Sequence, residues 1–194
     1  MNSMGDLLIK HDLVNRINSL LEAKEKVIVA IEGNSGAGKS TLAGELAKVF
    51  DLNLFHMDDF FLTPDLRTPE RLSEVGGNVD YVRFGKEVIE NLKRGHAFSY
   101  RRYDCSKKEL GDCILVSPRK LNVIEGSYSM HPYFTDIYDF RIFMHADEVK
   151  QRERILKRNG PILFERFINE WIPMENRYFK EFRIMEKSDL VIET

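Results

Sequence analysis

Apolar positions along the chain follow two periods, one typical of buried strands and the other typical of amphipathic helices. Short runs made mostly of apolar residues, which are typical of strands covered on both faces, occur at residues 27–32, 53–57, 121–124, 140–144 and 190–192. Apolar residues at helical spacing fill much of the chain between these runs. Strands that alternate with helices predict an α/β fold with a five-stranded, mostly parallel sheet and right-handed crossovers.

The helical segments place apolar residues on one face and charged residues on the other. Within an N-terminal packing helix, expected in residues 1–25, the apolar face holds Leu7, Leu8, Val14, Ile17, Leu20 and Leu21. Further helices are predicted after Lys39, over 80–92 with Gly95 as the stop signal, after an Asp147 cap, and over about 164–185. Pro173 is expected to kink or divide the last of these helices.

Residues from about 62 to 118 interrupt this alternation. Their first part is rich in proline and glycine, which predicts a loop with one short helix that begins at Thr68-Pro69. Later, residues 98–104 and 112–116 predict the two strands of a small hairpin flap. We expect the whole region to form an acceptor site, because long loops in compact domains often cover substrates.

The first strand runs into a glycine-rich segment that matches the P-loop pattern G-x-x-x-x-G-K-[ST]. The segment is Gly33-Asn34-Ser35-Gly36-Ala37-Gly38-Lys39-Ser40-Thr41. Its glycines let backbone N–H groups point at an anion, and the following helix adds its positive end. Lys39 would reach the β- and γ-phosphates, and the Ser40 hydroxyl would hold Mg²⁺. The segment predicts that the chain binds ATP together with Mg²⁺.

Phosphoryl transfer also needs groups outside the P-loop, and the strand ends supply candidates. Asp58 follows the second strand, where a carboxylate could take the proton of an acceptor hydroxyl. Glu125 ends the third strand in a Walker-B-like position, where it would hold Mg²⁺ or one of its waters. The basic helix at about 147–162 would close as a lid that neutralises phosphate charge.

Each of these assignments has a simpler alternative. Asp58 could cap a helix or turn, with Asp59 as its solvated neighbour, and Glu125 could be an ordinary strand-terminal acid. The basic helix could be a solvated face. Four of the five histidines have no metal-ligand spacing and are interpreted as structural or surface residues; they are His56, His96, His131 and His145.

With these residues in place, the chain resembles the uridine kinase branch of the phosphoribulokinase and uridine kinase family of P-loop kinases, from about residue 26 onward. Three motifs carry the resemblance: Gly33 to Ser40, Met57-Asp58-Asp59-Phe60-Phe61, and Val123-Ile124-Glu125-Gly126. The resemblance implies that Asp58 is the general base, that Glu125 serves magnesium and that Phe60 lies beside the substrate. It also implies that Tyr103 borders the nucleobase.

The lid and the acceptor side match the family less closely. By the resemblance, Arg154 and Arg158 would bind the nucleotide and Arg152 the substrate. The family's pyrimidine-contacting histidine corresponds to about Lys107 or Lys108, and its ribose-binding aspartate is vacant here or shifted to Asp80. Uridine kinases are often oligomeric, so the resemblance also implies that a homo-oligomer is plausible.

Composition narrows the function further. The 29 Lys and Arg residues nearly balance 31 Asp and Glu residues, for a formal charge of −2, which argues against a nucleic-acid or membrane-surface binder and favours a small-molecule partner. Cys105 and Cys113 form no metal-ligand set, so we expect unpaired thiols in a reduced, cytoplasmic compartment. The sequence contains no run of eighteen apolar residues, so it predicts no membrane span.

We therefore expect residues 1–194 to form a single P-loop kinase domain, a three-layer sandwich with a helical lid and a hairpin flap. Its expected activity is ATP-dependent phosphoryl transfer to a hydroxyl of a nucleoside or nucleoside-like molecule, with uridine or cytidine first. Nicotinamide riboside, pantothenate and a sugar alcohol stay open as acceptors, as does a P-loop kinase outside this branch. A nucleotide-dependent switch would need a guanine-reading Asn-Lys-x-Asp segment, which is absent, and a binding-only relative would not need Lys39, Ser40, Asp58 and Glu125 intact.

Overall fold

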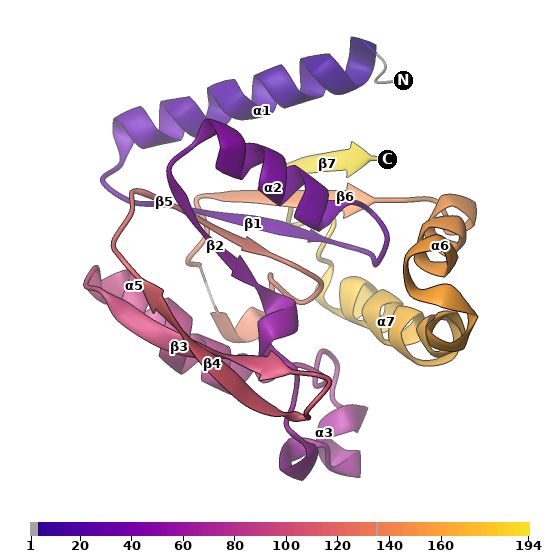
Figure 1. Ribbon diagram of the computed structural model, residues 1–194. Helices are drawn as coiled ribbons and strands as arrows, with labels where there is room; N and C mark the ends of the chain where they lie inside the picture. The colour runs from indigo at the N-terminus through magenta and orange to yellow at the C-terminus, as the bar shows by residue number, and fades with distance from the viewer. Residues whose placement is uncertain (1–3, 135) are drawn as a thin grey trace.

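A five-stranded sheet organises the computed structural model, which describes residues 4–134 and 136–194 (Figure 1). The strands are β1 (Val27–Gly33), β2 (Leu52–His56), β5 (Leu121–Glu125), β6 (Phe140–His145) and β7 (Leu190–Glu193). They lie in the order β2-β5-β1-β6-β7, and every neighbouring pair is parallel. The predicted α/β sheet is confirmed, and the strand that leads into the P-loop lies at its centre.

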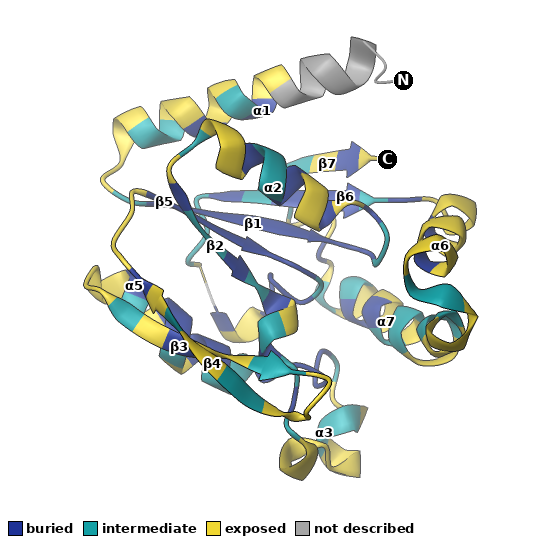
Figure 2. Ribbon diagram, viewed as in Figure 1, coloured by how far each residue is buried: buried dark blue, intermediate teal, exposed yellow. Residues whose placement is uncertain are grey.

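Burial on both faces explains why these segments are almost continuously apolar. All seven residues of β1 are buried, and its alternate side chains serve two separate cores. Ile28 and Ala30 pack into one core, whereas Val27, Val29 and Ile31 pack into the other. A parallel sheet covered on both faces requires this pattern. Figure 2 shows the buried sheet between helices whose outer surfaces are exposed.

Two helices cover one face of the sheet. They are α1 (Met4–Ala23) and α2 (Lys39–Val49), which lie side by side above the strands in Figure 1. Leu13 and Ile17 of α1 are buried in the same core as Leu42 and Leu46 of α2, so the N-terminal helix is a packing helix. The side chains of Leu7 and Leu8, which we expected on the same face, lie outside the described residues.

The other face is covered by a helix and a hairpin that belong to the predicted acceptor region. The helix comprises α4 (Tyr81–Phe84), a π-helical turn (Gly85–Ile89) and α5 (Glu90–Arg94). It ends where predicted, at Gly95, whose φ of 74° suits a glycine C-cap. The hairpin strands β3 (Phe98–Asp104) and β4 (Glu109–Val116) pair antiparallel, as expected.

Shorter elements connect β2 to this helix. They are the 3₁₀ turns Met57–Phe60 and Pro64–Leu66 and the helix α3 (Pro69–Ser73), with another 3₁₀ turn at Pro132–Phe134 after β5. The Thr68 hydroxyl accepts a hydrogen bond from the Arg71 N–H at 3.2 Å, which confirms the predicted cap of α3.

The C-terminal helices differ from the prediction in where they break. Helix α6 (Glu148–Arg166) begins at its Asp147 cap as expected, and it continues through a π-helical turn (Phe167–Trp171) into α7 (Ile172–Phe182). The sharp interruption lies at Gly160, whose φ of 73° and ψ of 173° are not helical, and not at Pro173. Pro173 lies just after the π-helical turn, and the helix continues through it into α7. None of the helices in the described part of the chain is long and apolar enough to cross a membrane.

One buried carboxylate ties three of these elements together at the edge of the sheet. Glu32, near the end of β1, is fully buried and accepts hydrogen bonds from the N–H groups of Gly33, Tyr128 and Met130 at 3.0 to 3.1 Å. The Tyr178 hydroxyl of α7 lies 3.1 Å from its second oxygen. Burial raises the pKa of Glu32 to about 7, although these donors oppose the shift.

This raised pKa predicts a specific pH dependence of stability. The folded state holds the Glu32 proton more tightly than an unfolded chain does, in which the pKa of the carboxyl group is 4.5. The bound proton therefore stabilises the fold fully below pH 4.5, and this stabilisation is lost as the pH rises through about 7. Relative to Glu32→Gln, the wild type should lose about 2 kcal/mol of unfolding free energy between about pH 5.5 and pH 8. Urea unfolding of both proteins measures this difference.

The exposed Glu22 on α1 provides a matched control, because Glu22→Gln removes the same group without a buried titration. Its unfolding free energy should track that of the wild type at both pH values. A wild-type to Glu32→Gln difference that does not change with pH would contradict the assignment.

Candidate active site

The P-loop joins β1 to α2 with a backbone that only glycine can follow at several points. A Cβ at Gly33 would lie 2.0 Å from the carbonyl oxygen of Met144 on the neighbouring strand β6. Gly36 and Gly38 have φ values of 81° and 94°, which side chains rarely adopt. Helix α2 starts immediately after Gly38, so the positive end of its dipole faces the loop. The segment therefore has the backbone of an anion-binding loop.

Lys39 is held inside this loop. Its ammonium donates to the carbonyl oxygens of Gly33 and Asn34 at 2.7 and 3.0 Å and lies 3.3 Å from the Ser127 hydroxyl. The side chain of Asn34 in turn bonds to both backbone groups of Ala146, which fixes the loop against the end of β6. The ammonium is therefore positioned at the mouth of the loop, where phosphate oxygens would meet it.

Ser40 and Glu125 form the candidate magnesium site. The Ser40 hydroxyl lies 3.1 and 3.2 Å from the two carboxylate oxygens of Glu125, which is buried at the end of β5. A hydroxyl and one carboxylate are oxygen donors of the kind that Mg²⁺ prefers, since Mg²⁺ usually takes its remaining ligands from waters and phosphates. The donor set fits the ion. No cluster of acids, histidines and cysteines among the described residues would hold a metal by itself.

His56 belongs to the site, although we interpreted it from the sequence as structural or surface. Its Nδ1 lies 2.5 Å from a Glu125 oxygen, because β2 and β5 pair with His56 opposite Glu125. This hydrogen bond to Glu125 raises the pKa of the His56 imidazole. The ring therefore shares the Oε1 atom of Glu125 with Ser40, orients the carboxylate and brings positive charge to it at lower pH.

Asp58 lies in the 3₁₀ turn that follows β2 and is exposed at the surface. Among the described residues, no protein donor is in hydrogen-bond range of its carboxylate, unlike the carboxylate of a capping residue. Surrounding protein atoms displace water from it and raise its pKa, the Lys39 ammonium lowers it, and Glu125 raises it again. Asp58 also follows His56 by two residues, and His56 lies opposite Glu125 across β2 and β5, so Asp58 is on the same side of the sheet edge as the candidate magnesium ligand.

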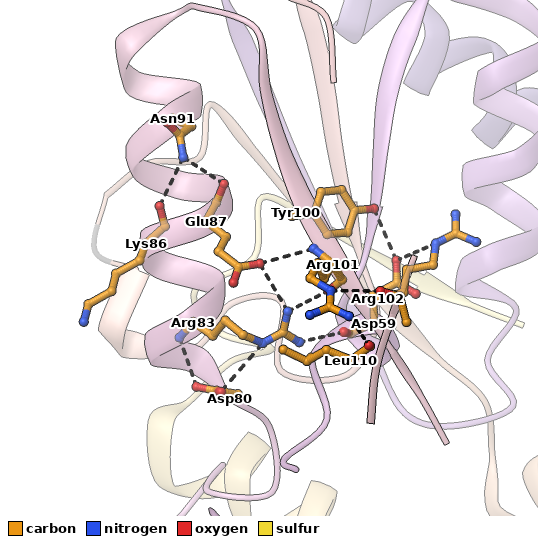
Figure 3. Close-up of polar contacts among 11 residues, drawn as sticks. Asp59, Asp80, Arg83, Lys86, Glu87, Asn91, Tyr100, Arg101, Arg102 and Leu110 are labelled. Atoms are coloured by element: carbon orange, nitrogen blue, oxygen red, sulfur yellow. Dashed lines mark hydrogen bonds and ion pairs between the residues drawn. The ribbon is translucent and has the colours of Figure 1, made fainter. Parts of the chain in front are cut away.

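The neighbouring Asp59 has a different role and is not a solvated residue. Its carboxylate lies 3.2 Å from the Tyr100 hydroxyl and 3.4 Å from Arg102 Nε, both on β3 (Figure 3). Its carbonyl oxygen accepts from Arg83 at 2.8 Å. Asp59 therefore anchors the end of β2 to the hairpin.

Asp80, the candidate ribose ligand, also lies in this network. Its carboxylate caps α4 through the N–H of Arg83 at 3.0 Å and lies 3.7 Å from Arg83 Nε (Figure 3). The Asp80 N–H donates to the carbonyl oxygen of Phe60 at 2.7 Å, so the structure brings these two predicted residues together. The Phe60 ring, however, is fully buried against Phe84 and Tyr100. The ring is therefore part of the core, and its place beside the substrate stays a prediction.

The hairpin turn brings Tyr103 and Cys105 to the same region. Tyr103 is partly buried at the end of β3, and the exposed Cys105 follows in the turn. Burial raises the pKa of the Cys105 thiol, and the Asp58 carboxylate raises it further, which places the turn near Asp58. Cys105 and Cys113 are both free thiols, as predicted.

Lid residues on α6 border a pocket beside the P-loop. Arg154 donates to the Gly36 carbonyl oxygen at 3.1 Å and to the Thr194 hydroxyl at 2.9 Å. With Arg158, it helps to line a pocket of about 720 Å³ that extends from the loop to the end of β7. Arg152 instead forms an exposed ion pair with Glu148 at 3.1 Å, so its link to a substrate stays a prediction.

Sequence patterns missed one further residue in contact with the loop. Glu175 of α7 is buried and accepts from the Ser35 N–H at 2.9 Å and from the Ser35 hydroxyl at 2.6 Å. The Ser127 hydroxyl donates to it at 2.8 Å. Ser127 could have been found from its position two residues after Glu125, but nothing in the sequence near Glu175 relates that residue to the loop.

Comparison with known proteins finds relatives of the whole chain, in sequence and in fold. The chain matches no model of a known protein family. It is 24% identical over 173 residues to a uridine kinase of Clostridium perfringens, a match that covers 80% of this chain and 82% of that protein. A structure described as a possible uridine kinase from Bacillus stearothermophilus shares its fold with a TM-score of 0.68 at 21% identity, over 93% of this chain and 99% of that one.

A second structure supports the fold independently. YFH7 of Saccharomyces cerevisiae, described as a candidate P-loop containing kinase with a circular permutation, has a TM-score of 0.68 at 13% identity. That match covers 95% of this chain and 98% of the yeast chain. Sequence and fold comparisons thus agree: over most of its length the chain has distant similarity to uridine kinases, and it shares its fold with solved structures that are described as kinases.

Proposed function

We propose that this protein transfers the γ-phosphoryl group of ATP to a hydroxyl group of a nucleoside or nucleoside-like small molecule. The juxtaposition of Asp58 with Lys39 and Glu125 carries the proposal. The Asp58 carboxylate has no protein donor in the part of the chain that the structure describes, and it lies near the lysine that would bind phosphate. It is therefore free to accept the proton of an acceptor hydroxyl that attacks the phosphoryl group. A nucleotide switch has no need of a base in this position.

The residues of the chain divide the work of transfer among them. The backbone N–H groups of the P-loop and the Lys39 ammonium would stabilise the charge of the migrating phosphoryl group. Asp58 would orient the acceptor hydroxyl and accept its proton, and its raised pKa makes it a better proton acceptor than an ordinary aspartate. Bound Mg²⁺, held by Ser40 and Glu125, would supply further neutralisation of phosphate charge.

The pocket next to the P-loop supports ATP as the donor. Its volume of about 720 Å³ is within the range of small-molecule sites, and it reaches from Gly38 and Thr41 toward Arg154 and Arg158. With its base and ribose in this pocket, ATP would place its phosphates on the loop and under the lid arginines. We infer that the acceptor enters from the opposite side, between Asp58 and the hairpin turn.

Uridine and cytidine are the first acceptors to test, because the relatives that align over most of the chain are uridine kinases. Nicotinamide riboside, pantothenate and sugar alcohols form the rest of the panel. ADP release from purified protein with Mg·ATP should rise strongly with one acceptor class. Acceptor-independent release alone would contradict the kinase proposal and favour a switch or a binding protein.

Replacing Asp58 by Asn tests the base directly. We expect the kcat for the stimulating acceptor to fall about 10²- to 10⁴-fold, because proton transfer is lost, while the affinity for ATP stays within about twofold. The exposed Asp51, at the other end of β2, gives the matched control Asp51→Asn, which should behave as wild type. If Asp58→Asn retains turnover within a few-fold, Asp58 is not the base.

Replacing Lys39 by Ala tests the donor site. Nucleotide affinity in titration calorimetry should weaken roughly 30-fold or more, since loss of one partner of a desolvated charge pair costs on the order of 2 to 5 kcal/mol. Lys48→Ala, at an exposed position on the same helix, is the control and should bind as wild type. Unaltered binding by Lys39→Ala would show that the nucleotide does not occupy the P-loop.

A further inference from the structure

Helix α7 places a carboxylate directly on donors of the phosphate loop, and the proposed transfer does not use it. Glu175 accepts from both the N–H and the hydroxyl of Ser35, the third residue of the P-loop motif, at 2.9 and 2.6 Å. It also accepts from the Ser127 hydroxyl at 2.8 Å. The side chain is only 4% exposed, so this is a built contact and not a surface rotamer.

The surrounding residues hold Glu175 in this position. One turn further along α7, Tyr178 is fully buried and its hydroxyl bonds to Glu32 behind the loop. Gln151 of α6 donates to the Ser35 carbonyl oxygen at 2.9 Å. Both helices that follow β6 are therefore attached to Ser35, α6 through its carbonyl group and α7 through its N–H and hydroxyl groups.

The position of Glu175 brings it close to where a terminal phosphate would bind. The Ser127 hydroxyl contacts the Glu175 carboxylate and also lies 3.3 Å from the Lys39 ammonium. In a P-loop the lysine reaches the β- and γ-phosphates, so a γ-phosphate on Lys39 would lie next to the carboxylate. Like charges that approach in a site with little water repel strongly. The β-phosphate, deeper in the loop, is farther from this conflict.

We infer that Glu175 is a specificity-determining residue that makes the loop distinguish a triphosphate from a diphosphate. Its carboxylate and the γ-phosphate compete for the Ser35 donors, so a triphosphate binds only as Glu175 turns away from Ser35. A diphosphate leaves the contact in place. Triphosphate binding therefore releases the hold of α7 on the loop, whereas the Gln151 contact of α6 remains. The inference rests on the nucleotide-binding part of the proposed function.

Glu175→Gln separates charge from packing. The glutamine oxygen can accept from the Ser35 N–H, and its amide can donate to the Ser35 and Ser127 hydroxyls, which rotate to accept. Titration calorimetry with adenylyl imidodiphosphate and with ADP, both with Mg²⁺ and without acceptor, gives the two affinities. We expect the triphosphate analogue to bind about tenfold more tightly to the variant, because one like charge is removed, and ADP to bind within about twofold of wild type.

Two further variants complete the test. Glu175→Asp keeps the charge and should retain the wild-type ratio of triphosphate to diphosphate affinity. Glu181→Gln, an exposed acid on the same helix, should leave both affinities unchanged.

The inference is overturned if Glu175→Gln binds both nucleotides as wild type does, tightens both equally, or weakens both as a purely structural residue would. These outcomes are distinct from a failure of the proposed function. Failure of wild-type protein to bind ADP would refute the P-loop assignment itself, and failure to find an acceptor would leave both affinities measurable.

Discussion

The site depends on one buried carboxyl group, that of Glu32, which needs the four hydrogen-bond donors around it. A carboxylate at the end of the central strand is removed from water and can be accommodated only because N–H groups and a tyrosine hydroxyl surround it. Those donors come from β1 itself, from the turn after β5 and from α7. Satisfying Glu32 therefore fixes the phosphate loop, the strand end that carries Glu125 and the C-terminal helix relative to one another. Apolar packing alone is not directional and would not fix this alignment.

Around this frame, the site concentrates negative charge near a single lysine. Asp58, Glu125 and Glu175 all act on the same small region, and the ammonium of Lys39 offsets part of their repulsion. Such an arrangement is costly unless cations complete it, and the proposed Mg²⁺ would be one such cation. The acids are also separated in function by their partners. Glu125 is held by Ser40 and His56, and Glu175 by serines, whereas the carboxylate of Asp58 has no protein donor among the described residues.

Local patterns explain how much could be predicted from the sequence. The five strands, the P-loop, the stop at Gly95 and the cap at Asp147 depend on neighbours within a few residues, and all were predicted. His56 and Glu175 could not be, because their roles depend on strand register and on a helix that docks about 140 residues after the loop. The burial of Phe60 was not predicted for the same reason, since its partners Phe84 and Tyr100 come from later elements. The break at Gly160 was missed because Pro173 was the stronger local signal.

The first glycine of the P-loop is required for a different reason than the lysine. Gly33 has no room for a side chain because the backbone of β6 passes against it, whatever the loop binds. Gly33 is thus required by the fold, whereas Lys39 and Ser40 are required by the proposed chemistry. A descendant of this protein that lost its activity would be free to change Lys39 and Ser40 but would be obliged to keep Gly33. Partial survival of the motif is therefore a sign of common ancestry and not of enzymatic competence.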